Sequence, residues 1–320
     1  MWAAGLLGAA GGIAGCTSGD GRGAAEPLRS DRSPTVTPSA TASRGALPKL
    51  RPWVPSTYDV APGVKTSAVR LVETAATWES GDAGPDNASR RLVAAGYDGD
   101  LVDDLLPVLG EGDAAVAQVV VAQYGGILTD SASVLVVVDQ WVRTEGGQIR
   151  AGGTTLDVRL VAAEPHWNVT TVRPARPGQD VHDLSRPARR LLASERVVLP
   201  HAAEADVRSG QISDSVLSAL MSLSRLHRLD VSILRSGHPL RVFGTDRTSN
   251  HTEGLAVDIW ALDGRAIIDS GDSPSVADFM RAASEAGAYQ VGGPRDLDGA
   301  DALYFSDDTH QDHLHLGFTA

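Results

Sequence analysis

The residues best suited to metal chemistry lie near the C-terminus. The segment from 249 to 260 reads SNHTEGLAVDIW, and its Asp258 is a carboxylate inside an apolar run. A buried carboxylate is costly unless a hydrogen-bonding group or a cation compensates it. His251 would lie about 10 Å from Asp258 if both were on one helix, and Gly254 disfavours a helix there. A polar turn leading into a strand instead lets His251 fold back beside Asp258, where a metal ion would compensate the carboxylate.

A histidine pair near the end of the chain could complete such a site. Five of the nine histidines fall within the last 83 residues. The final segment DHLHLGF predicts a strand, on which His313 and His315 face the same side about 6.6 Å apart. One of them can bind a metal while the other faces the remaining coordination position. With His251 and Asp258 this gives a His, Asp, His donor set, which suits a catalytic zinc site that keeps one position for water.

The spacing of these residues resembles a known family of zinc peptidases. The pattern S-x-H-x-x-G-x-A-x-D at 249–258, followed by H-x-H at 313–315, is similar to that of the zinc D-alanyl-D-alanine carboxypeptidases and peptidoglycan endopeptidases. That family shares its fold with the hedgehog signalling domain. The resemblance covers roughly residues 185–320. It implies that His251, Asp258 and His315 bind Zn²⁺ and that the substrate is a peptidoglycan peptide.

The resemblance leaves the general base open. Some members of the family use a Glu three residues before the last metal ligand, and this chain has Asp312 at that position. Other members carry the His-x-His form, which His313 matches, and there the first histidine assists catalysis or stabilises the oxyanion. Either side chain could accept the proton of the attacking water.

The substrate-binding residues depart from the family pattern. Family members carry an Arg in or after a Ser-Gly-Tyr-Arg segment, whereas this chain reads LRSGH at 234–238 and lacks the Tyr-Arg pair. Arg235 and Arg247 are the candidates, because a guanidinium can bind a carboxylate through two hydrogen bonds. Ser249 is assigned to the same role or, alternatively, caps the turn before His251. His238 and His310 fit hydrogen-bonded or surface histidines better than site residues.

Two α+β units are expected to carry these residues. In the unit that contains the motif, 185–320, helical spacing and apolar runs predict helices at 185–194, 213–228 and 274–287 and strands at 229–237, 255–262 and 312–318. In the preceding unit, 49–178, the same patterns predict helices at 66–78, 89–96 and 100–109 and strands at 115–124, 132–142, 155–163 and 166–174.

The role of the unit at 49–178 is left open by its sequence. Helices followed by an antiparallel meander argue for α+β structure. The element order resembles the cone-shaped nuclear-transport-factor-like fold. The unit contains no acid–base pair or metal-ligand spacing, so the expected roles are spacer, partner docking or ligand binding in a cone.

The N-terminus resembles that of a bacterial lipoprotein. Residues 2–15 are apolar or small and precede Cys16, the only cysteine. The apolar run is shorter than the roughly 20 residues that a membrane-spanning helix needs. The resemblance implies a signal peptide at 1–15, a lipid anchor at Cys16 and a location on the extracytoplasmic face of the cell membrane. Residues 16–48 are rich in Ser, Thr, Pro, Gly and Ala, which predicts a flexible tether.

The composition restricts the function. The formal net charge of −12 argues against nucleic acid as a partner, because phosphate binding needs clustered Lys and Arg. The leading hypothesis is a lipid-anchored zinc peptidase that acts on peptidoglycan peptides. The alternative is an inactive zinc-containing module that binds peptidoglycan or a protein partner. The sequence does not fix the oligomeric state.

Overall fold

The computed structural model describes residues 43–163, 167–299 and 301–320. The expected signal peptide, Cys16 and the tether as far as residue 42 lie outside this range, as does His166, the first residue of the strand expected at 166–174. The described residues belong to one compact unit, which includes both segments separated above. The mixed α+β class is confirmed. Within the described range, every helix is too short or too polar to pass through a bilayer.

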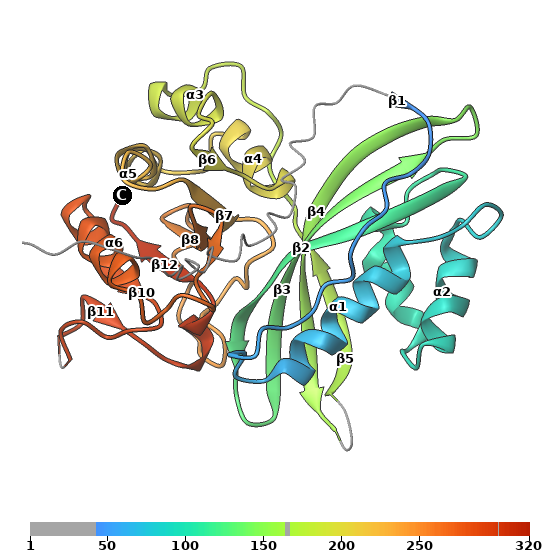
Figure 1. The fold of residues 1–320 in the computed structure, drawn as a ribbon, viewed down its shortest axis with the longest axis horizontal. Coiled ribbons are helices and arrows are strands. Elements are labelled where there is room, and N and C mark those ends of the chain that lie inside the picture. The colour runs from blue at the N-terminus through green and yellow to red at the C-terminus, as the bar shows by residue number, and fades with distance from the viewer. Residues whose placement is uncertain (1–42, 164–166, 300) are drawn as a thin grey trace, which may run out of the picture. The chain divides into compact units, whose positions relative to one another are not determined.

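The first half forms an antiparallel sheet with helices on one face (Figure 1). The strand order is β1-β4-β3-β2, and β5 also pairs with β4. The helices are α1 (Pro62–Ala76), α2 (Pro85–Ala94) and the 3₁₀ helix η1 (Gly99–Val108). The strands are β1 (Ser43–Arg44), β2 (Ala114–Ile127), β3 (Ser131–Arg143), β4 (Gln148–Ala162) and β5 (Trp167–Pro174).

The apolar pattern explains how this half packs. In α1, Val64, Ala68, Leu71 and Ala75 recur at helical spacing and are fully buried against the sheet. Strand β3, however, is buried along both faces for most of its length. Its second face must therefore be covered by another part of the chain.

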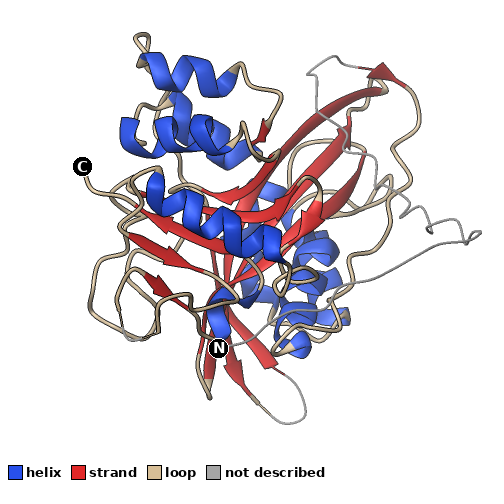
Figure 2. Cartoon of the chain, turned by 60° about the vertical axis from the view of Figure 1, so that its left-hand side comes forward, coloured by secondary structure: helices blue, strands red, loops and turns tan. Residues whose placement is uncertain are grey.

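The second half forms a mixed sheet flanked by helices (Figure 2). The strand order is β11-β10-β12-β8-β7-β6, and β9 pairs with β8. The helices are α3 (Arg186–Leu192), α4 (His201–Arg208), α5 (Asp214–Leu223), α6 (Pro274–Glu285) and the 3₁₀ helix η2 (Asp308–Gln311). The strands are β6 (Val197–Val198), β7 (Leu229–Ile233), β8 (Ala256–Leu262), β9 (Arg265–Ala266), β10 (Gln290–Gly292), β11 (Tyr304–Phe305) and β12 (Leu314–Gly317).

The two halves pack against each other through the second face of the first sheet. Val121, Leu135 and Val137 from β2 and β3 form a buried cluster with Ile233 from β7. The approach is close at Gly126, where an added Cβ would lie 2.2 Å from the Cβ of Phe243. This contact brings the end of β2 next to the segments that carry the histidine motif.

Candidate metal centre

Asp258 and His315 are brought together by strand pairing. They are directly opposite each other on β8 and β12, which run antiparallel. Residues in such a pair project to the same face of the sheet. The Nδ1 atom of His315 lies 3.0 Å from Oδ1 of Asp258. The alternation of the two strands therefore places one nitrogen and one carboxylate oxygen side by side.

His251 reaches the same point from the turn before β8. Its Nε2 atom lies 3.1 Å from Asp258 Oδ1 and 3.2 Å from His315 Nδ1. The turn depends on Gly254, whose φ is +70° and whose added Cβ would lie 2.0 Å from the carbonyl oxygen of Gln211. The Nδ1 atom of His251 lies 2.6 Å from the Leu234 carbonyl oxygen. A proton on Nδ1, donated to that carbonyl, leaves Nε2 free to bind a metal.

The three donor atoms match the dimensions of a zinc site. Two ligands held about 2.0–2.1 Å from a tetrahedral zinc lie about 3.3 Å apart. The three distances among His251 Nε2, Asp258 Oδ1 and His315 Nδ1 are 3.0–3.2 Å. Two imidazole nitrogens and one carboxylate oxygen are also a donor set that zinc accepts. The residues present therefore fit a divalent ion with three protein ligands.

The electrostatics of the cluster favour the metal-binding protonation states. Burial acts to raise the pKa of Asp258, but the neighbouring histidines His251, His313 and His315 hold it well below its usual value. Burial lowers the pKa of His315 to about 4, and Asp258 opposes this only in part. Near neutral pH the aspartate is therefore ionised and His315 is neutral, which are the forms that coordinate metals.

His313 and Asp312 form a hydrogen-bonded pair beside the three donors. His313 Nε2 lies 3.8 Å from Asp258 Oδ1, and His313 Nδ1 lies 2.6 Å from Asp312 Oδ1. Asp312 Oδ2 contacts the Lys65 ammonium and accepts the backbone N–H of Tyr124. Burial acts to lower the pKa of His313, yet Asp258 and Asp312 raise it above its usual value. Of the two candidate bases, His313 has its Nε2 atom toward Asp258. Asp312 contacts the other ring nitrogen of His313 and so orients the ring.

His238, which the sequence analysis treated as a surface or hydrogen-bonded histidine, lies in the cluster. Its ring stacks on that of His251, with centroids 4.1 Å apart. His238, His251 and Asp258 each offer a ligand atom, and these atoms lie within 4.8 Å of one another. The Nδ1 atom of His238 lies 2.9 Å from the Pro239 carbonyl oxygen. The sequence offered a signal, because His238 stands where the zinc peptidases that the motif resembles have the Tyr of their Tyr-Arg pair.

The three expected substrate-binding residues have different surroundings: two lie in or beside the turn that carries His251, and the third is exposed. Arg235 donates from Nε to the carbonyl oxygen of Thr252 and so supports the turn that carries His251. Ser249 is buried and its Oγ accepts the backbone N–H of His251, as a turn cap would. Arg247 is exposed, and within the described ranges its side chain has no hydrogen bond or ion pair with His251, Asp258 or His315.

Two residues of the first half also reach the cluster and were not predicted. Gln123 on β2 donates from Nε2 to Asp258 Oδ2 over 2.7 Å, and Lys65 on α1 contacts Asp312. Both are polar residues at apolar positions of their elements, and that was the available signal. No metal-ligand spacing marks these two residues in the sequence, because Gln123 contacts the side chain of Asp258 and Lys65 contacts that of Asp312.

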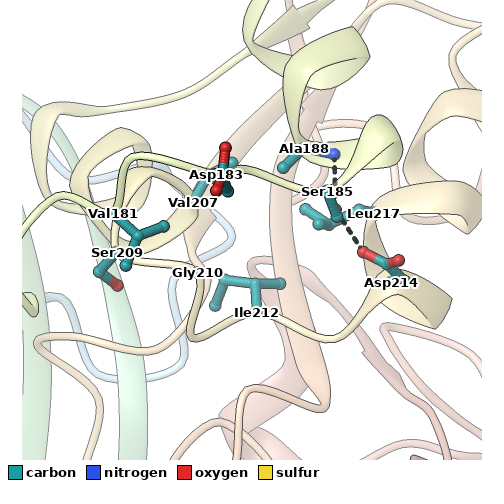
Figure 3. A pocket seen from close by; sticks show the side chains of 10 residues that line it. All are labelled: Val181, Asp183, Ser185, Ala188, Val207, Ser209, Gly210, Ile212, Asp214 and Leu217. Carbon is teal, nitrogen blue, oxygen red and sulfur yellow. Dashed lines mark hydrogen bonds between the residues drawn. The ribbon is translucent and has the colours of Figure 1, made fainter.

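A cavity of about 290 Å³ lies elsewhere in the second half (Figure 3). It is lined by residues around α3, α4 and α5, where Ser185 hydrogen-bonds to Asp214 and caps α3. None of the cluster residues lines it. Its volume is at the lower end for ligand pockets, and we assign it no role in the chemistry.

Comparison with protein-family models, with curated proteins and with solved structures finds no significant match to the chain. The geometry of the cluster therefore carries the functional argument, together with the motif spacing described above.

Proposed function

We propose that the chain is a zinc-dependent peptidase of the cell envelope that hydrolyses peptidoglycan peptides, as a carboxypeptidase or an endopeptidase. The observation that carries this proposal is the convergence of His251 Nε2, Asp258 Oδ1 and His315 Nδ1 within 3.0–3.2 Å of one another, with His313 beside them. Three protein ligands leave the fourth position of a tetrahedral ion for water or substrate. That arrangement is the one expected of a catalytic site.

The side chains around the cluster can divide the work of peptide hydrolysis. Zinc at such a site supplies an activated water and polarises the carbonyl that is attacked. His313 can accept a proton at Nε2, because the Asp312 carboxylate holds its Nδ1 proton and stabilises the charged ring. The same nitrogen can then return the proton to the amine that leaves.

The substrate and location come from the resemblance and from the N-terminal pattern. A lipid anchor at Cys16 followed by a tether would hold the enzyme at the extracytoplasmic face of the membrane, within reach of the cell wall. Stem or cross-bridge peptides are the substrates that fit this location. Arg235 and Arg247 remain the proposed partners of the peptide carboxylate, and Arg247 is exposed and available for that role.

The proposal is tested by metal content and by digestion of muropeptides. The purified full-length chain should contain about one zinc per molecule, and His251→Ala should lose it. Mass analysis of digested muropeptides should show either release of a terminal D-alanine or separation of cross-linked dimers. A wild-type chain that binds no zinc would overturn the proposal.

His238 gives a specific reason to consider the second candidate, a zinc-containing binding module. A fourth protein ligand would close the coordination sphere, as in structural zinc sites. If His238 fills that position, His238→Ala should weaken zinc binding as strongly as His315→Ala does. For the peptidase we expect His238→Ala to change zinc affinity less than tenfold, whereas His315→Ala lowers it by more than a hundredfold. Zinc bound without cleavage of any muropeptide would favour the binding module.

A further inference from the structure

Strand β2 of the first sheet contributes directly to the surroundings of the metal cluster. Two register irregularities, between Val119 and Val121 and between Tyr124 and Gly126, flank the short stretch that contains Gln123. Such bulges re-aim side chains and increase local twist. The stretch is fixed in place by the apolar cluster of Val121 with Leu135 and Ile233. The side chain of Gln123 is buried at the boundary with the second sheet.

Gln123 distinguishes the two oxygens of Asp258. Its Nε2 donates to Oδ2 over 2.7 Å, while Oδ1 faces His251 and His315. A carboxylate with one oxygen hydrogen-bonded in this way presents the other to a metal in a fixed orientation. The amide nitrogen is therefore placed as a second-layer contact of a metal ligand.

The hydrogen bond to Asp258 is the main polar interaction of the Gln123 side chain. Gln123 is fully buried, and its Oε1 has no hydrogen-bond partner among the described residues. A buried amide with an unpaired oxygen is unfavourable for folding. An apolar side chain of the same length would serve the packing better, so the contact with Asp258 is the reason we assign for an amide here.

A second connection runs from α1 to His313. The Lys65 side chain is 3% exposed, and its Nζ lies 2.7 Å from Asp312 Oδ2 and also contacts Asp59. The other oxygen of Asp312 holds His313 Nδ1 at 2.6 Å. Buried charges are retained only where they are well paired. Lys65 thus holds the Asp312 carboxylate in place, and this carboxylate in turn orients the His313 ring.

The backbone of β2 completes this second connection. β2 is at the edge of its sheet in the described structure, and the outward N–H of Tyr124 donates to Asp312 Oδ2 over 3.0 Å. The Lys65 ammonium also lies 4.4 Å from the centre of the Tyr124 ring. Asp312 is therefore held by α1 and by β2 at once, and both elements belong to the first half.

We infer that Gln123 and Lys65 are positioning residues of the metal site, so that the first half of the chain is a working part of the peptidase and not a spacer. Gln123 orients the metal-binding oxygen of Asp258. Lys65, with Asp59, orients Asp312 and through it His313. This inference rests on the proposed function, because it takes the cluster to be a metal site.

The role assigned to Gln123 is tested by zinc binding, a measurement that needs no substrate. Gln123→Met keeps the length of the side chain and removes the donor. We expect its zinc dissociation constant, measured in the full-length chain by competition with a chromophoric chelator, to rise 10- to 100-fold. The visible spectrum of the Co²⁺-loaded variant should also shift, because that spectrum reports ligand geometry.

Gln140→Met is the matched control for this measurement. Gln140 is a buried glutamine on β3 that donates to the carbonyl oxygens of Ala76 and Val108, on the helical side of the same sheet. Its replacement should lower the unfolding midpoint while zinc affinity stays within threefold of wild type and the Co²⁺ spectrum is unchanged. Unchanged affinity and spectrum in Gln123→Met would overturn the assignment of Gln123.

The role assigned to Lys65 is tested with the double variant Lys65→Met with Asp59→Asn. This pair removes one cation and one carboxylate together, so the net charge of the buried cluster is unchanged. Since Lys65 contacts no metal ligand, we expect zinc affinity within threefold of wild type, kcat 10- to 100-fold lower and KM nearly unchanged. Nitrogen NMR of His313 should show loss of the single tautomer that Asp312 selects. Wild-type kcat and an unchanged tautomer would overturn the assignment of Lys65.

The outcomes separate this inference from the proposed function. A wild-type chain that binds no zinc would contradict both the proposed function and this inference. A wild-type chain that binds zinc but cleaves nothing removes the peptidase, while the affinity, Co²⁺ and NMR measurements still decide the two positioning roles.

Discussion

The roles of individual side chains in the cluster are set by their hydrogen bonds. Leu234 O selects the tautomer of His251 that exposes Nε2, and Asp312 does the same for His313. Asp312 stands where some of the zinc peptidases that the motif resembles have a Glu base, but its two oxygens contact His313, Lys65 and the backbone of Tyr124 and none of the three candidate ligands. It therefore acts through His313.

The role of Asp312 leads to a prediction for Asp312→Asn. Its amide cannot compensate a charged His313 ring, so kcat should fall by about 10²–10⁴-fold, while zinc content remains at one per chain. Muropeptide kinetics and metal analysis of the same preparation check this. Loss of zinc together with activity would show that Asp312 supports the ion itself.

The buried histidines predict how stability depends on pH in the metal-free chain. The folded-state pKa of His315 is about 4 and that of His238 is well below its usual value, both chiefly because of burial. Both would titrate near 6.5 when unfolded. Between pH 6.5 and 4 the unfolded chain therefore binds more protons, so the free energy of unfolding should fall as pH falls, by roughly 1–3 kcal/mol.

Urea denaturation in the presence of a chelator measures this effect at pH 7 and pH 4.5. Replacement of His315 by Phe should flatten the dependence. Replacement of the exposed His182 by Gln should leave it unchanged. Equal pH dependence in all three proteins would contradict the prediction.

At the residue scale, the sequence pointed to the three candidate ligands that the structure brings together, but not to the side chains that contact them. His251, Asp258 and His315 could be proposed as ligands from the sequence, because a metal imposes residue types and spacing that can be compared with coordination geometry. Gln123 and Lys65 could not be predicted in this way, because a second-layer contact is defined by tertiary packing between elements far apart in the chain. Lys65 did leave a trace: one of only two lysines, it falls on the apolar stripe of α1.

At the scale of elements, apolar periodicity predicted the long helices and strands, including α1, β3 and β8. It missed the helix α4, the 3₁₀ helix η2 and the strands β1, β6, β9, β10 and β11. These strands have two or three residues each, which is too few to show a period. The segment at 100–109 is a 3₁₀ helix, and Pro107 within it disfavours regular α-helical hydrogen bonding. Pairing of β12 with β8 could not be read from either strand alone, although it brings His315 to Asp258.

The turn before β8 predicts a large effect for Gly254→Ala. The added Cβ would meet the Gln211 backbone in addition to the unfavourable φ, so the free energy of unfolding should fall by about 2–4 kcal/mol and zinc affinity should fall with it. Gly264→Ala is the matched control, because Gly264 has a φ of +74° but its Cβ would meet only an Arg228 side-chain atom at 3.8 Å. That variant should lose about 1 kcal/mol and keep its zinc affinity. Denaturation and chelator competition test both, and equal losses would contradict the steric argument.

At the scale of the whole molecule, the contact between the sheets predicts that zinc stabilises both halves. Binding at a hundred times the dissociation constant adds about 2.7 kcal/mol to whatever unfolds as one unit with the site. Because Gln123 connects the first half to Asp258 and Lys65 connects it to Asp312, zinc should slow amide exchange in β3 as well as in β8 and β12. Hydrogen-exchange mass spectrometry with and without chelator measures this. Protection confined to the second half would show that the halves unfold independently.

The contact between β2 and Asp312 also has a consequence for solubility. β2 is a long apolar strand whose outer side is met by Trp78 at one end and by Asp312 at the other. A strand edge left open is a template for pairing with another copy of the chain. A change at Asp312 that removes this contact is therefore expected to promote aggregation as well as to impair chemistry, because the Asp312 side chain both orients His313 and covers one end of the β2 edge.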